Sequence, residues 1–421
     1  MFKSIIGKII STIKNSDKKI LTFVLVFLGI GLFYCILIYA TGSSPTGNPK
    51  ISLFGSRYSS RTNDGLMGII GLVTSFSLVS FILLKKYKPQ FFTDKKKIVI
   101  MVLTALFLVL SAGVYFYGSR VVTKKYYPKF WDSFHYLLGA KYYPEVGYNQ
   151  FYNCLLKADK ERLVPVYDSG YRARDLDTYR FTSVERLLQK ADCSGFTPDR
   201  WEEFKKDTEF FSDYTLKKVL HDHGYNGTPF AASIASKIAN IPEFTFKNIV
   251  KLTFIDILAV SGLFALLVWA FGWKLAALFA LFYFSNFADR FYYVGASYFR
   301  YIWMVTLGAG IAFLKKEKYK PAALFMTASA MLNVFPLLFM VGIGFKILIE
   351  FIKTKTLSAN YRAFLIWAVI GTIAFGAISI AQKNHIYNYK EFFSNMSKHS
   401  KKLTRSRIGF QYNLLHKGEY T

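Results

Sequence analysis

The residues best suited to chemistry in this chain are carboxylates, and they are gathered in one segment. Seventeen of the 26 Asp and Glu residues lie between Ser119 and Val250. This polar segment contains Trp131-Asp132-Ser133-Phe134-His135-Tyr136, which begins about a dozen residues after a hydrophobic run. A carboxylate among aromatic side chains near a membrane interface can have its charge state tuned toward base catalysis. Asp132 is therefore the first candidate catalytic residue, although Asp is also a favoured N-cap for a helix over 134–140.

His135 follows Asp132 by three residues, so a helix would place the two side chains on one face. Such a pair could bind a phosphate or a divalent metal, or it could make an ordinary hydrogen bond. The three cysteines show no Cys-x-x-Cys or His/Cys spacing of the kind that zinc sites use. The sequence therefore predicts no cofactor, and it indicates no metal beyond the one that an Asp/His pair allows.

A second cluster lies in Tyr171-Arg172-Ala173-Arg174-Asp175-Leu176. Two Arg side chains separated by one residue could grip a phosphate group through bidentate hydrogen bonds. A solvated strip of surface ion pairs is the alternative for Arg172, Arg174 and Asp175.

A third candidate is the turn-rich loop from His221 to Pro229, which lies some twenty residues before a hydrophobic run. Its polar side chains could bind substrate near a membrane surface; they are His221, Asp222, Tyr225 and Asn226. Asn226-Gly227-Thr228 also matches a glycosylation sequon, a short pattern that arises often by chance.

Four ionisable residues lie in or beside hydrophobic runs, where charge is expensive and often marks a site. They are Asp256, Asp289, Arg290 and Arg300. Asp289 and Arg290 also fit side chains that extend into the membrane interface, and Arg300 is placed where it could hold an anionic lipid phosphate.

Hydrophobic runs must position all of these residues. The hydrophobic fraction is 52%, and a bilayer core of roughly 30 Å needs about 20 apolar residues per helix. The sequence predicts an all-α polytopic transmembrane helix bundle with about nine spans, some short or broken, and a large extracytoplasmic α-rich loop. The predicted runs are Ile20–Ala40, Met67–Leu84, Ile98–Gly118, Leu252–Trp273, Lys274–Phe287, Tyr298–Leu314, Ala322–Ile352 and Ala363–Ala381. The run Ala322–Ile352 is too long for one span, and Asn333-Val334-Phe335-Pro336 predicts a break inside it.

Charge sets the predicted orientation. The net charge is +28, and outside the segment 119–250 there are 34 Lys and Arg against 9 Asp and Glu, many in short links between runs. This pattern is typical of the positive-inside rule and of attraction to anionic lipid, rather than of nucleic-acid binding. The basic N-terminus is then cytoplasmic and the polar segment extracytoplasmic.

The predicted organisation has four parts: three N-terminal spans (1–118), the extracytoplasmic loop with interfacial helices (119–250), a C-terminal transmembrane bundle (251–381) and an extracytoplasmic tail (382–421). The tail ends in polar residues without a terminating helix, as a truncated or split form of a longer protein would. Cys154 and Cys193 lie in the loop, where they could pair in an oxidising compartment or remain free thiols.

An Asp just beyond an early span, in a large outer loop followed by many spans, resembles the GT-C type of integral-membrane glycosyltransferase. The short-helix pair broken at Phe335-Pro336, after Lys320-Pro321, resembles the same superfamily. The stretch from Trp131 to Tyr142 also looks like uncharacterised bacterial membrane proteins of this type. One departure is that two spans precede the span leading into the Asp132 loop, whereas the family usually has its Asp after the first span.

The resemblance implies a transfer of sugar from a polyprenyl-phosphate donor to an extracytoplasmic glycan, lipid or protein acceptor. Asp132 would be the base that deprotonates the acceptor hydroxyl, and Arg172, Arg174 or Arg300 would neutralise the departing phosphate. A transporter or lipid flippase, in which charged residues of the spans line a pathway, is the main alternative. A non-catalytic membrane scaffold is the third.

Overall fold

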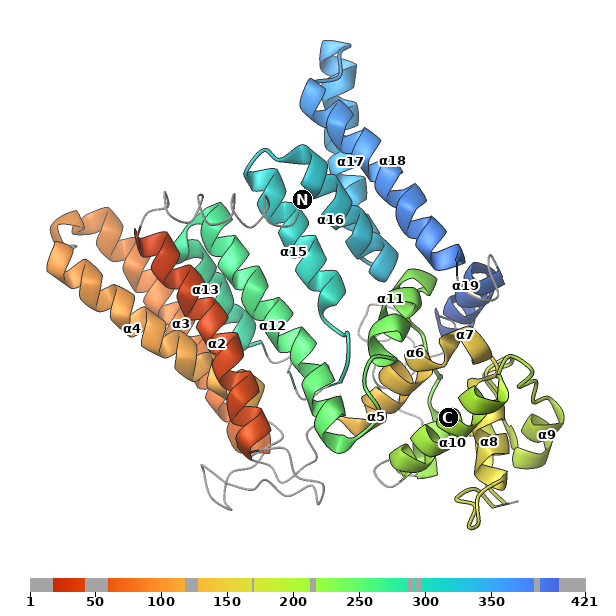
Figure 1. Cartoon of the computed structure of the whole chain (residues 1–421). Coiled ribbons are helices and arrows are strands. Elements are labelled where there is room, and N and C mark those ends of the chain that lie inside the picture. The colour runs from red at the N-terminus through yellow and green to blue at the C-terminus, as the bar shows by residue number, and fades with distance from the viewer. Residues whose placement is uncertain are drawn as a thin grey trace, which may run out of the picture. The chain divides into compact units, whose positions relative to one another are not determined.

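The computed structural model describes residues 18–41, 60–91, 93–117, 128–168, 170–212, 217–286, 291, 297–381 and 387–400. Within these ranges the regular structure is almost entirely helical (Figure 1). The strands found there form one short antiparallel pair, β1 (Arg172–Arg174) and β2 (Phe181–Ser183), in which Ala173 lies opposite Thr182. The predicted all-α fold class is confirmed.

Five helices in the described part of the chain are long and apolar enough to cross a membrane. They cover Lys19–Ala40, Gly65–Leu84, Lys96–Phe116, Phe246–Phe271 and Ala359–Ile380. Two apolar helices, Trp273–Phe284 and Ile302–Lys315, are shorter. Length and composition therefore indicate a membrane protein with several transmembrane helices.

The chain divides into two compact units. Unit 1 comprises Met1–Ser133 and Pro242–Phe375, and unit 2 comprises Phe134–Ile241 and Gly376–Thr421. Unit 1 thus joins the predicted first three spans to most of the predicted C-terminal bundle. Unit 2 joins most of the predicted loop to the predicted tail.

The helices of unit 1 account for the hydrophobic runs of the sequence. They are α2 (Lys18–Thr41), α3 (Ser60–Tyr87), η1 (Pro89–Phe91), α4 (Asp94–Ala112), the π-helical segment η2 (Gly113–Tyr117), α5 (Phe130–Ser133), α12 (Phe246–Phe271), α13 (Trp273–Phe284), α15 (Ile302–Lys315), α16 (Tyr319–Leu332), α17 (Leu337–Thr354) and α18 (Ala359–Ile380), of which the last extends across the boundary into unit 2. The predicted break is confirmed, because α16 ends at Leu332, Asn333 is extended, and α17 begins after Pro336.

Helix α12 packs between α2 and α15, and small residues bring these helices close together (Figure 1). A Cβ on Gly31 of α2 would lie 2.4 Å from Oγ of Ser261, and a Cβ on Gly308 of α15 would lie 2.6 Å from Leu263. Close approach through Gly and Ser is the usual means by which helices associate in lipid, where apolar surface alone gives little preference for another helix.

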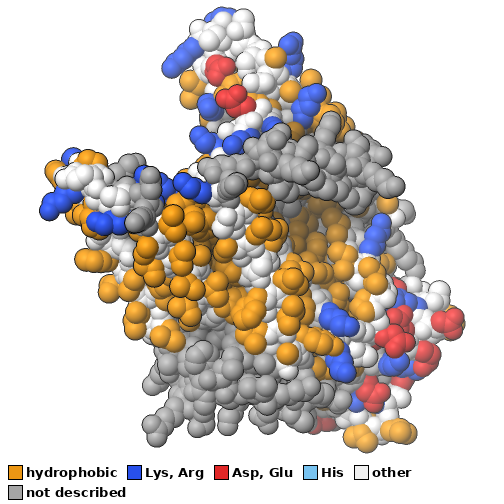
Figure 2. All heavy atoms as spheres, turned by 60° about the vertical axis from the view of Figure 1, so that its left-hand side comes forward, with side chains coloured by type: hydrophobic (Ala, Val, Ile, Leu, Met, Phe, Trp, Pro, Cys, Tyr) orange, Lys and Arg blue, Asp and Glu red, His pale blue; other side chains and the backbone are white. Residues whose placement is uncertain are grey.

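Unit 1 exposes many large hydrophobic side chains on its helices, including Leu72, Phe76, Leu110 and Ile373. Figure 2 shows such side chains gathered in a broad band over one face, with Lys and Arg side chains at its upper edge. Exposed apolar surface of this extent is expected where the surrounding solvent is lipid.

Unit 2 is built from short elements around an aromatic core. They are η3 (Phe134–Leu138, π-helical), α6 (Gly139–Lys141), α7 (Tyr143–Val146), α8 (Phe151–Lys160), the two strands, α9 (Val184–Gln189), α10 (Pro198–Ser212), η4 (Lys217–His221), α11 (Pro229–Ala239) and α19 (Tyr387–Ser400). Local sequence explains where α11 starts. The side chain of Thr228 accepts a hydrogen bond from the backbone N–H of Ala231, and Pro229 occupies the first turn.

A disulfide ties two parts of unit 2 together. Cys154 of α8 is bonded to Cys193, which follows α9, with 5.7 Å between their Cα atoms. The structure therefore selects the paired state from the two alternatives that the sequence leaves open.

Candidate functional site

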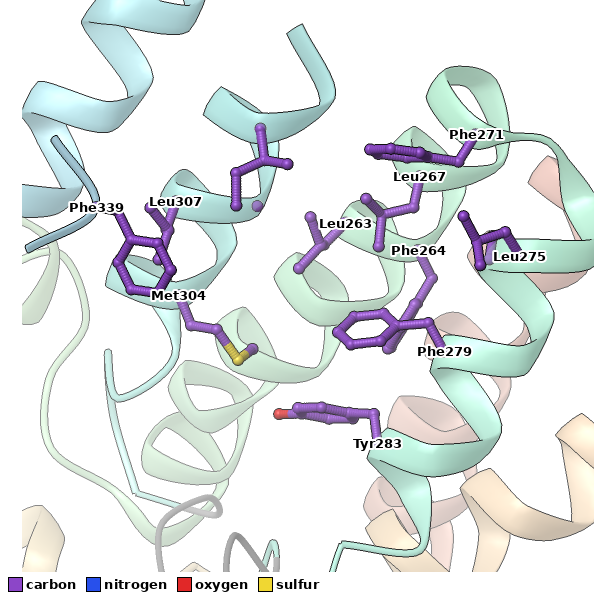
Figure 3. Close-up of a pocket in the computed structure, with 13 residues that line it drawn as sticks. Leu263, Phe264, Leu267, Phe271, Leu275, Phe279, Tyr283, Met304, Leu307 and Phe339 are labelled. Carbon is purple, nitrogen blue, oxygen red and sulfur yellow. The ribbon is translucent and has the colours of Figure 1, made fainter. Parts of the chain in front are cut away.

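An apolar cavity lies in unit 1, between α12, α13 and α15, with Phe339 of α17 also at its wall. Its volume is about 370 Å³, which is within the range of small-molecule sites. Figure 3 shows side chains such as Leu263, Phe279 and Met304 directed into this apolar pocket. The ring of Tyr283 crosses one end, and the surface of the pocket is entirely apolar. The shape and chemistry fit a hydrocarbon chain.

The hydroxyl of Tyr283 in α13 belongs to a group of three tyrosines, with Tyr115 in η2 and Tyr301 immediately before α15. Tyr115, in the π-helical segment η2, donates to the Tyr283 hydroxyl at 3.3 Å and lies 3.2 Å from the hydroxyl of Tyr301. All three side chains are buried. A small polar centre therefore lies beside the pocket, on the hydroxyl side of Tyr283, and π-helical segments such as η2 are frequent at functional sites.

Asp256 of α12 fixes the chain beside this centre. The side chain is fully buried, and its two oxygens accept hydrogen bonds from the backbone N–H groups of Arg300 and Tyr301, each at 3.0 Å. These N–H groups lie at the start of α15, where an α-helix leaves donors without partners in its own backbone. Asp256 thus caps α15 from another helix and sets the positions of Arg300 and Tyr301.

Asp132, the predicted base, lies in the first turn of α5 in unit 1. Its Oδ2 forms an ion pair with Nζ of Lys129, and its side chain is 18% exposed. The preceding Phe130 is buried, with its ring 5.9 Å from that of Phe246 at the start of α12. Aromatic packing therefore holds α5 against α12, while the carboxylate remains partly accessible.

His135 lies in η3 of unit 2 and is buried. Its Nε2 is 2.8 Å from the hydroxyl of Tyr152, and its Nδ1 is 3.9 Å from a carboxylate oxygen of Asp222. The Tyr152 hydroxyl also accepts from the N–H of Gly224 at 3.1 Å, and it lies 3.3 Å from the carbonyl oxygen of Val219. The Tyr152 hydroxyl donates to this carbonyl and lies within hydrogen-bond distance of His135, so it links the imidazole to the backbone of the loop.

Burial raises the pKa of Tyr152 well above its ordinary value, and the nearby Asp222 carboxylate adds to the rise. The phenol therefore keeps its proton at neutral pH. Tyr152 and His135 form a buried pair that lies next to the partly exposed carboxylate of Asp222.

The predicted arginine cluster makes contacts with the backbone. Arg174 donates from Nε to the carbonyl of His221 at 2.9 Å and from Nη1 to that of Tyr179 at 2.8 Å. Arg172 donates to the carbonyl of Phe181 at 3.1 Å. The bond to His221 joins the strand pair to η4, and the two bonds of Arg174 engage donors that a bidentate phosphate contact would use.

Asp175 accepts from the backbone N–H of Asp177 and from Nζ of Lys190, each at 2.8 Å. Burial would raise the pKa of Asp175, but the hydrogen bonds from Lys190 and Asp177 outweigh it, so the pKa lies below the ordinary value. Asp175 therefore remains a carboxylate that orders its own turn.

The other loop candidates take part in a tyrosine cluster of unit 2. The ring of Tyr225 stacks on that of Tyr148 at 6.2 Å, and the side chain of Asn226 accepts from the hydroxyl of Tyr136 at 2.6 Å. Asp289 and Arg290 lie outside the described residues.

The tyrosines of unit 1 and an ionic network of unit 2 are polar groups that sequence reasoning missed. In the network, Lys141 is 1% exposed, and its Nζ lies 2.7 Å from Oδ2 of Asp207 and 2.7 Å from Oε1 of Glu203. Tyr142 also donates to Asp207 at 2.7 Å. The available signal was a Lys within the apolar stretch Phe134–Tyr143, since a buried Lys is almost always paired.

Within the ranges that the structure covers, no three His, Cys, Asp or Glu side chains converge as a metal site would require. Comparison of the chain with protein-family models, with curated proteins and with solved structures returns no match. The argument for function therefore rests on the chain's own residues.

Proposed function

We propose that this protein is a membrane enzyme that acts on a lipid-linked substrate, and that its reaction is glycosyl transfer of the GT-C type from a polyprenyl phosphate. The observation that carries the proposal is the apolar pocket of unit 1, whose wall includes Tyr283, a member of the buried tyrosine group. A hydrocarbon chain in the pocket would bring its polar head to a region where tyrosine hydroxyls and buried charge are concentrated.

The proposed reaction is a displacement at the sugar carbon that bears the phosphate. The Asp132 carboxylate takes the proton of the acceptor hydroxyl, the acceptor oxygen bonds to this carbon, and the bond from the carbon to the phosphate oxygen breaks. The bonding electrons leave with the polyprenyl phosphate. We assign the offset of this charge to Arg300, whose backbone is held by Asp256, because Arg174 is already engaged by backbone carbonyls.

The proposed orientation places the active face outside the cytoplasm of a bacterial inner membrane. The disulfide between Cys154 and Cys193 supports it, since such bonds persist in oxidising compartments. Helix α12 begins at Phe246, soon after the segment of unit 2 that carries this disulfide, so its N-terminal end would be extracytoplasmic. In this arrangement the shorter helices α13, α15, α16 and α17 complete a bundle of about nine spans.

The experiment is transfer of labelled sugar from a polyprenyl-phosphate donor by the protein in proteoliposomes, with lipid and glycan acceptors. Asp132→Asn should lower the transfer rate by about a hundredfold or more, the usual contribution of a general base. Asp199→Asn is the matched control, because Asp199 is an exposed carboxylate in α10. Full transfer by Asp132→Asn would show that Asp132 is not the base.

The pocket is tested separately with Ile311→Trp, which adds bulk at its wall, against Ile370→Trp on an exposed face of α18. We expect the first variant to raise the KM for the donor about tenfold and the second to leave it unchanged.

A lipid flippase is the second candidate, because Asp256 is an ionisable residue within a span. It predicts transbilayer movement of the donor without sugar transfer, which the same proteoliposomes measure with a fluorescent donor.

A further inference from the structure

Two lysine ammonium groups converge on one indole at the end of α12. Nζ of Lys316 lies 5.4 Å and Nζ of Lys318 lies 5.3 Å from the ring centroid of Trp269. The indole is itself held in place, because its ring lies 5.7 Å from that of Phe313 on α15. Each distance is within the range of a cation–π interaction.

The turn after α15 holds the two lysines in this arrangement. The backbone N–H of Lys318 donates to the carbonyl of Phe313 at 2.9 Å, and that of Glu317 donates to Leu314 at 2.9 Å. Glu317 has a φ of 54°, the left-handed conformation that this type of helix end requires. The turn is therefore a defined structure, and Lys316 and Lys318 lie on either side of its left-handed residue.

Bringing two ammonium groups to one ring costs electrostatic free energy, since like charges repel. The negative face of the indole offsets part of this repulsion. An anion between the two ammonium groups would offset more, and the link supplies a net positive field, with Lys315, Lys316, Lys318 and Lys320 against Glu317. Phosphate is the anion for which Lys is a common binding residue.

The position of Trp269 identifies the source of the phosphate. It lies two residues before the end of the candidate span Phe246–Phe271, at the depth where Trp is enriched in membrane proteins. Basic residues beside a span attract the anionic lipids of the adjoining leaflet. A phosphate presented at this depth belongs to a lipid headgroup.

We propose that Trp269, Lys316 and Lys318 form a binding site for the headgroup phosphate of an anionic membrane phospholipid. This site is at the opposite end of α12 from Phe246, beside which Asp132 is placed by α5. The proposed lipid site requires that α12 crosses the membrane, and it does not depend on the proposed transfer reaction.

The test compares phosphatidylglycerol with phosphatidylcholine, each titrated into the purified full chain and measured by native mass spectrometry. The quantity is the ratio of the two affinities. Lys316→Ala with Lys318→Ala should lower this ratio roughly twenty- to thirtyfold, from about a fivefold effect of each juxtamembrane lysine. Lys315→Ala with Lys320→Ala is the control, because it removes the same charge from the same link. It should change the ratio by less than about threefold, since charges outside the site act through screened solvent.

An equal loss of preference in both double variants would assign the effect to diffuse charge and overturn the proposal, as would no loss in either. Lys316→Arg with Lys318→Arg keeps both charges on the ring and should retain most of the preference. Inorganic phosphate at the concentration of the lipid should not displace phosphatidylglycerol, and full displacement would identify a free anion as the ligand instead.

Discussion

Replacing Lys141 with Met should destabilise unit 2 by about 3 kcal/mol at pH 7. The variant leaves the buried carboxylate of Asp207 without its ammonium partner, and breaking a buried ion pair in this way costs about 3–5 kcal/mol. The lower end of this energy range applies, because Tyr142 still donates a hydrogen bond to Asp207 at 2.7 Å. For a unit of this size the loss corresponds to a fall in unfolding temperature of about 10 °C.

The effect should depend on pH in a defined direction. Burial raises the pKa of Asp207 above its ordinary value, although Lys141 and Tyr142 pull it down. Without Lys141 the pKa rises further, so Asp207 in the folded variant takes up a proton at a higher pH than in the unfolded chain. Protonation removes the unpaired charge. The destabilisation is therefore greatest at neutral pH and shrinks as pH falls through the raised pKa.

The assay is thermal unfolding of the full chain followed by tryptophan fluorescence between pH 5 and 8. Lys160→Met is the control, because it removes the same charge from an exposed position at the end of α8 and should change stability by less than about 0.5 kcal/mol. Lys141→Met with Asp207→Asn should recover part of the loss, since no uncompensated charge remains. An unchanged unfolding temperature for Lys141→Met at pH 7, or a loss that does not shrink with falling pH, would refute the reasoning.

Three further outcomes are expected from the same unfolding measurement. Asp256→Asn should lower the free energy of unfolding by about 2 kcal/mol, because an amide can accept at only one of the two positions where the carboxylate now accepts from the backbone before α15. Asp256→Ala should lower it further. Equal stability of Asp256→Asn and the native chain would argue against this role of Asp256. Cys154→Ser with Cys193→Ser should lower the free energy of unfolding by about 4 kcal/mol for a closed loop of this length. Maleimide should label Cys154 and Cys193 only after reduction. Labelling of these two residues in the untreated chain would contradict the disulfide. Gly310→Leu should lower the free energy of unfolding by about 1–3 kcal/mol, because a Cβ there would already lie 2.3 Å from a side chain of α16. Gly262→Leu is the tolerated control, because a Cβ at Gly262 would have nothing within 4 Å.

The parts of the fold that could be predicted from the sequence are those with a local cause. Apolar runs of sufficient length predicted the helices, and Pro336 predicted the break between α16 and α17. The packing order could not be predicted, because it depends on which small residues meet. Gly31 and Ser261 are over two hundred residues apart, and neither sequence context identifies the other as its partner.

The candidate site was less accessible to sequence reasoning for the same reason. Tyr115, Tyr283 and Tyr301 come from three distant segments, and in a chain with 29 Tyr none of them is distinctive by itself. Their meaning arises only when the helices bring the hydroxyls together beside the pocket. The spacing of Cys154 and Cys193 likewise allowed a bond without requiring one, and it is the packing of α8 with α9 that brings them together.

Asp132 and Asp256, two of the aspartates of unit 1 that the sequence singled out, differ in what their carboxylate oxygens contact. Both oxygens of Asp256 are occupied by backbone N–H groups at the start of α15, so taking a proton there would disrupt the cap that positions Arg300. Asp132 is partly exposed, and its ion pair with Lys129 engages Oδ2, which a substrate hydroxyl can replace without moving a helix. A base must be reachable by the group that it deprotonates. In the proposed reaction Asp132 is therefore a better base than Asp256, and Asp256 holds the backbone of Arg300 and Tyr301 in place.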